Sequence, residues 1–67
     1  MTVTATIIDV DSAGSETPIA HDVRLPRTPA DGQHLRVDGV PYRVAGSTWD
    51  IQGQETVVLV YVNRAAV

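Results

Sequence analysis

Alternation between apolar and polar residues predicts five short β-strands. Near the amino terminus, Val3, Ala5 and Ile7 alternate with threonines, which is the period of two expected of a strand with one buried face. The run TVVLVYVN is apolar at consecutive positions, as in a strand covered on both faces, so we expect it at the centre of the sheet. No segment favours a helix longer than one turn. The predicted strands lie near residues 2–10, 19–25, 33–37, 40–51 and 54–63.

Segments rich in Gly, Pro, Ser and Asp separate these strands. Residues 11–18 predict a mobile loop, and residues 26–32 predict an ordered connector or a single turn of 3₁₀ helix. Gly46 interrupts the alternation and predicts a bulge or sharp bend, after which the strand would change sheet. The register of the turn at QGQ stays open, because a loop that opposes Asp50 to Glu55 would pair like charges.

The segment VDGVPYRV predicts a tight hairpin. A two-residue type I′ turn at residues 38–39 places Val37 opposite Val40 and Arg36 opposite Pro41. Pro41 then directs its missing N–H away from this partner strand, which predicts an edge or a bend on its other side. The inward-facing side chains in this register are Leu35, Val37, Val40, Tyr42 and Val44, and the outward-facing ones are His34, Arg36, Pro41 and Arg43.

The outward face of this hairpin is basic and is the candidate binding surface. Its candidate residues are His34, Arg36 and Arg43, joined by Arg24 and Arg27. Arginine binds carboxylate and phosphate through two parallel hydrogen bonds, so the face could recognise an acidic protein surface or, as a weaker alternative, a nucleic-acid backbone. The competing interpretation is a solvated face that Asp22 and Asp38 neutralise.

Two aromatic side chains have two interpretations each. Trp49 is a candidate aromatic anchor for an interface, where such residues are enriched, and Tyr61 could play the same part. In a domain with only three aromatic residues, however, core packing is the favoured expectation for both rings.

Composition limits the function classes. A chain of 67 residues predicts one domain, 1–67, with a small core, because a domain of this size buries only about 60% of its unfolded surface. The net charge of −3 argues against a general nucleic-acid binder. The amino terminus has neither a signal-peptide pattern nor a long apolar run, so we expect a soluble, cytoplasmic protein without membrane contact. All basic residues are arginine, a bias typical of GC-rich coding, which an actinobacterium or one of its phages would fit.

No pattern in the chain indicates catalysis, a metal site or a cofactor. The chain has no cysteine, and its two histidines, His21 and His34, do not have the spacing of a ligand set. It also lacks a nucleophile elbow and a Gly-rich phosphate loop. We therefore expect a protein that is not an enzyme.

The segment LPRTPADGQHLRVDGVPYRVAGSTWDI resembles small SH3-like barrels of the kind found in short phage and prophage-encoded proteins. The resemblance implies a five-stranded SH3-like barrel, whereas the acidic, aromatic-rich groove of proline-binding SH3 domains is absent. Three functions follow as hypotheses. The first is a non-catalytic module that binds another protein, such as a phage accessory protein that binds a host protein. The second is a subunit that self-assembles through its edge strands, and the third is a nucleic-acid contact module.

Overall fold

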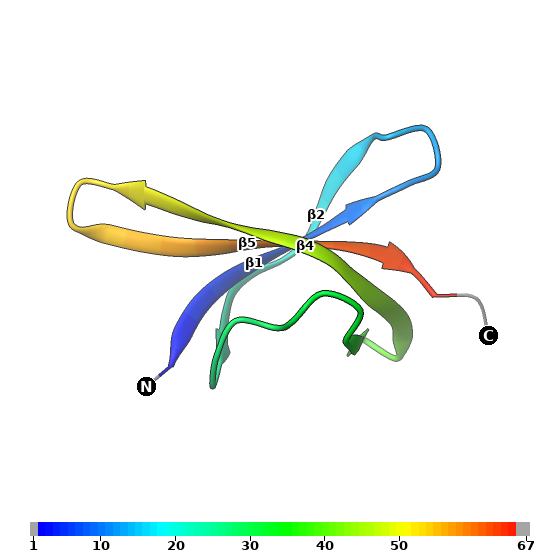
Figure 1. Cartoon of the computed structure of the whole chain (residues 1–67), viewed down its shortest axis with the longest axis horizontal. Helices are drawn as coiled ribbons and strands as arrows, with labels where there is room; N and C mark the ends of the chain where they lie inside the picture. Colours follow the sequence, from blue (N-terminus) through cyan, green and yellow to red (C-terminus); the bar gives the residue numbers. More distant parts are fainter. Residues whose placement is uncertain (1, 66–67) are drawn as a thin grey trace.

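The computed structural model describes residues 2–65 and contains β-strands but no helix in that range. The strands are β1 (Val3–Val10), β2 (Glu16–Leu25), β3 (His34–Val37), β4 (Val40–Gln52) and β5 (Glu55–Arg64) (Figure 1). The all-β prediction with five strands is confirmed, and the largest difference in bounds is the earlier start of β2. Nothing among the described residues forms a helix that could cross a membrane.

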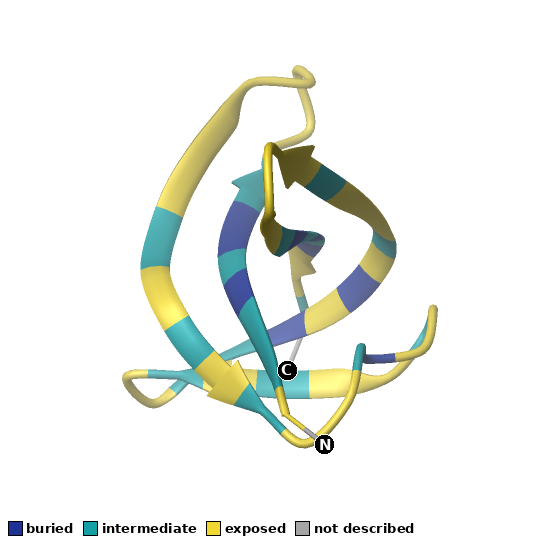
Figure 2. Cartoon of the chain, turned by 90° about the vertical axis from the view of Figure 1, so that its left-hand side faces the viewer, coloured by how far each residue is buried: buried dark blue, intermediate teal, exposed yellow. Residues whose placement is uncertain are grey.

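The five strands form one sheet in the order β2-β1-β5-β4-β3. Neighbouring strands are antiparallel except β1 and β5, which run parallel. The strand that is apolar on both faces, β5, lies at the centre of this order, as predicted. The sheet curls into a half-barrel whose outermost strands are largely exposed (Figure 2). The general barrel-like architecture is therefore confirmed.

The core lies on the inner side of the curled sheet. Alternate residues of β5 supply its centre, because successive side chains of a strand point to opposite faces. The buried cluster consists of Ala5, Ile7, Tyr42, Val44, Val58, Val60 and Val62. All but Tyr42 are small or medium-sized aliphatic residues, so this core is thin and its close packing matters for stability.

The predicted β3–β4 hairpin forms in the predicted register. Val37 pairs with Val40 and Arg36 pairs with Pro41. The φ angles of Asp38 and Gly39 are 51° and 81°, and a type I′ turn requires both to be positive. On the other side of β4, the ladder with β5 begins at Tyr42, the residue after Pro41. The Pro41 carbonyl accepts a hydrogen bond of 3.1 Å from the backbone N–H of Ala65, directly after β5. The proline thus marks the end of a ladder.

The predicted bend in β4 is a bulge. The register with β5 shifts between Val44 and Gly46, which leaves one extra residue on β4. The strand nevertheless pairs with β5 on both sides of the bulge, so the predicted change of sheet is wrong. At the far end of β4, Gln52 pairs with Glu55 and Asp50 pairs with Val57. Asp50 and Glu55 are therefore not opposite each other, and no like-charge pair forms in this turn.

The loop after β1 is shorter than predicted, and the connector is ordered, which is one of its two predicted forms. The loop after β1 ends at Ser15 rather than residue 18, and the Asp11 carboxylate accepts hydrogen bonds of 2.9 Å from the backbone N–H groups of Ala13 and Ser15. The prediction of a mobile loop over residues 11–18 therefore overstated its length, because Asp11 organises a compact turn. The connector is an ordered irregular segment without a 3₁₀ turn, and Pro29 within it is buried.

Candidate binding surfaces

Three of the predicted basic residues share one surface on β3 and β4. His34 and Arg43 are direct cross-strand partners, and Arg36 follows His34 two positions along β3. All three residues are exposed. On the next strand Asn63 lies opposite Arg43, and its side-chain amide donates a hydrogen bond of 2.9 Å to the Val10 carbonyl. The outward surface of these strands therefore presents basic groups beside an amide that is already engaged.

The other two predicted arginines occupy different places. Arg24 lies on β2, opposite Thr4, at the other edge of the sheet, and Arg27 lies in the connector. Within residues 2–65, the side-chain hydrogen bonds that the structure contains involve none of the arginines. The five predicted residues are exposed, but they do not form one face of the sheet.

A groove separates the two outermost strands, and we call it the edge groove. It has a volume of about 360 Å³, which falls within the usual range for binding cavities. Its lining residues are Ile7, Ala20, Val23, Leu25, Leu35, Arg36, Val37 and Asp38. Apart from Arg36 on β3 and Asp38 in the turn after it, the lining is apolar. In the described part of the chain, β2 pairs only with β1 and β3 only with β4, so the strands on either side of the groove each have a free edge.

Sequence reasoning missed the edge groove. The alternation of β3 indicated that Leu35 and Val37 face inward, and the structure confirms that side of the prediction. The β2 side was obscured by a bulge, because Ala5 pairs with Val23 whereas Ile7 pairs with Ala20. This irregularity adds a residue to β2 and breaks its simple alternation. No local signal states that two strands from opposite ends of the sheet order approach each other.

The expectation that Trp49 packs in the core is wrong. Its side chain is 56% exposed, and Ile51, on the same side of β4, is 68% exposed. Both belong to the part of β4 beyond the bulge, which β3 does not border. The tip of the β4–β5 hairpin extends along the longest axis of the molecule, past the other strands (Figure 1). We call residues 45–57 the projecting hairpin. Tyr61 is half-buried on the outer side of β5 opposite Ile8, so it contributes less to packing than expected.

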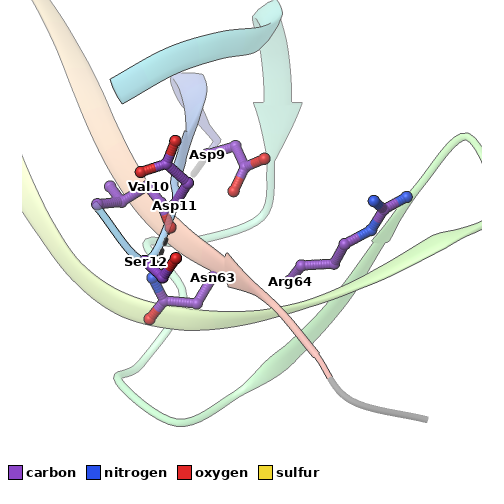
Figure 3. A pocket seen from close by; sticks show the side chains of 6 residues that line it. All are labelled: Asp9, Val10, Asp11, Ser12, Asn63 and Arg64. Carbon is purple, nitrogen blue, oxygen red and sulfur yellow. Dashed lines mark hydrogen bonds between the residues drawn. The ribbon is translucent and has the colours of Figure 1, made fainter. Parts of the chain in front are cut away.

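A second, polar pocket lies where the carboxyl ends of β1 and β5 meet (Figure 3). It is lined by Asp9, Val10, Asp11, Ser12, Asn63 and Arg64. Asp11 already caps the turn that follows β1, and Asn63 already binds the Val10 carbonyl. Figure 3 shows the Arg64 guanidinium directed away from Asp11. No group of three or more potential ligands for a metal ion occurs among residues 2–65. We therefore find less reason for a binding role here than at the edge groove.

Comparisons with known proteins identify no relative. No protein-family model, curated protein or solved structure matches the chain.

Proposed function

We propose that this protein is a non-catalytic protein-binding module that accepts an extended segment of its partner in the edge groove. The observation that carries the proposal is the pair of free strand edges, β2 and β3, on the two sides of an apolar groove. An extended segment gains affinity from backbone hydrogen bonds to such an edge and specificity from alternate side chains that enter pockets. Free edges are otherwise a liability in a small β protein.

The charges near the groove favour a partner segment with acidic residues. Arg36 lines the groove, and Arg24 lies on β2 between two lining residues. Arg27 lies two residues after the end of β2. Asp38, which also lines the groove, and Asp22 on β2 offset part of this charge. The proposed ligand therefore alternates apolar residues, which enter the groove, with carboxylates, which pair with the arginines.

The proposal extends to the biological setting. The resemblance of residues 25–51 to small SH3-like phage proteins supports an accessory protein of a phage or prophage, and the arginine-only basic composition supports an actinobacterial host. The partner would then be a host protein in the host cytoplasm. His34 and Arg43, on the outer side of the same hairpin, would widen the contact beyond the groove.

A library of displayed decapeptides tests the proposal. Selection on the wild-type protein should enrich peptides that alternate apolar and acidic residues, and their binding should weaken at least about tenfold in Arg36→Glu, which reverses one groove charge on an exposed side chain. Arg64→Glu is the matched control, because Arg64 lines the pocket at the ends of β1 and β5 instead. Peptides that bind both variants and wild type equally well would refute the groove as the binding site.

A further inference from the structure

We infer that the edge groove receives the projecting hairpin of a second copy of this chain, so that copies associate head to tail. The inference rests on the proposed function, since it names one occupant of the same groove. It joins two features that lie apart on one molecule: an apolar groove between β2 and β3, and a hairpin that extends past the other strands (Figure 1).

The projecting hairpin has the side chains that such a groove would bind. Trp49 and Ile51 are the exposed large hydrophobic residues of the described chain, and they lie two positions apart on one side of β4. Large exposed apolar side chains that cluster on a surface typically mark an interaction site, and tryptophan is among the residues most enriched in interface hot spots.

The backbone of the projecting hairpin is also free to pair. The β3 ladder reaches β4 only through Arg43, and connector hydrogen bonds of 2.8 Å continue it as far as Val44. From Gly46 to Gln52, β4 pairs with β5 on one side and with no described strand on the other. The same stretch of β4 carries the exposed side chains of Trp49 and Ile51. It can therefore add to a free edge of another copy by ordinary strand pairing.

The projecting hairpin is acidic and can pair with the arginine that lines the groove. The projecting hairpin carries Asp50 at its middle and Glu55 after its turn, and it has no basic residue. Arg36 lines the groove of the second copy beside Asp38, and Arg24 lies next to the lining residues Val23 and Leu25 on β2. Opposite charges on the two sides of a contact favour the correct pairing and speed association.

A contact of this kind is heterologous, because the two surfaces in it differ. Each copy then offers one hairpin and one groove. Such head-to-tail contacts close into a ring if the rotation between copies permits it and otherwise extend into a filament. Two variants that each lack one of the surfaces should therefore form a dimer when mixed and stop there.

This prediction defines the experiment. The hairpin variant is Trp49→Ala/Ile51→Ala, and the groove variant is Arg24→Glu/Arg36→Glu, in which only exposed side chains change. Matched controls are Thr48→Ala, beside Trp49 in β4, and Glu16→Arg, which changes an exposed acidic residue at the start of β2. Circular dichroism confirms that each variant is folded, and analytical ultracentrifugation measures its mass across concentrations.

We expect wild type and both controls to form species larger than a dimer. Each double variant should associate at least about 30-fold more weakly, the loss expected of a hot-spot residue. A mixture of the two double variants should give a dimer. Association of the hairpin variant equal to that of wild type, or a mixture that stays monomeric, would overturn the inference. If wild type is monomeric while selected peptides still bind the groove and fail to bind Arg36→Glu, this inference falls and the proposed function stands.

Discussion

Val60 is the position at which truncation tests the assigned core most directly. It lies in the central strand, opposite Ile7 on one side and Ser47 on the other, and its side chain is 0% exposed. Val60→Ala removes two methyl groups, worth roughly 1.6 kcal/mol of burial at about 0.8 kcal/mol per group. The cavity left behind raises the expected loss of unfolding free energy to about 2.5 kcal/mol.

That loss is a large fraction of the total stability. A chain of this length has an expected unfolding free energy of about 3–10 kcal/mol, at about 0.05–0.15 kcal/mol per residue. With a urea dependence of about 1 kcal/mol per M, the midpoint of Val60→Ala should fall by roughly 2.5 M. Urea unfolding followed by far-UV circular dichroism measures this shift. One low protein concentration is used throughout, because self-association would add to the apparent stability.

Val57→Ala is the matched control, because it makes the same chemical change three residues earlier in β5, at a half-buried position on the outer side of the sheet. The expected loss there is about 1 kcal/mol or less, since fewer contacts disappear and solvent fills the space. Equal losses for the two variants would refute the conclusion that the inner side of the half-barrel is the core.

Three further measurements test local features. Gly39→Ala should cost about 1 kcal/mol of unfolding free energy because Gly39 has a φ of 81°, whereas Gly46→Ala, with open space around it, should leave the urea midpoint nearly unchanged. Asp11→Ala should lower the stability by about 1 kcal/mol through the loss of two hydrogen bonds to backbone N–H groups, and Ser12→Ala should not; thermal unfolding compares them. In dilute protein, acrylamide should quench Trp49 fluorescence readily because the ring is 56% exposed, and a weakly quenched signal would contradict its placement.

The sequence predicted the parts of the fold that depend on neighbours along the chain. The pairing of Val37 with Val40 followed from turn chemistry, because an Asp-Gly pair adopts the positive φ angles of a type I′ turn. The central place of β5 followed from the absence of a polar face in it. The grouping of His34, Arg36 and Arg43 needed nothing beyond the register of that hairpin.

The features that remained hidden depend on the curl of the whole sheet. Trp49 has the apolar character of a core residue, but it lies on the part of β4 that β3 does not border, and its side chain is exposed there. The edge groove brings Val23 of β2 near Leu35 of β3, although three strands separate these two in the sheet order. Periodicity assigns a face to each residue, but it does not state how far the sheet bends.

The open form of this half-barrel connects its stability to its proposed function. A core of one curled sheet, without disulfides, leaves a small surplus of stability, and β2 and β3 each keep a free edge in the described chain. A strand bound in the edge groove would satisfy both edges and cover Val23, Leu35 and the other apolar lining residues. At a concentration 100 times its Kd, such a ligand would add about 2.7 kcal/mol to the unfolding free energy. This gain is about the size of the loss expected for Val60→Ala, so occupation of the groove should restore that variant to nearly wild-type stability.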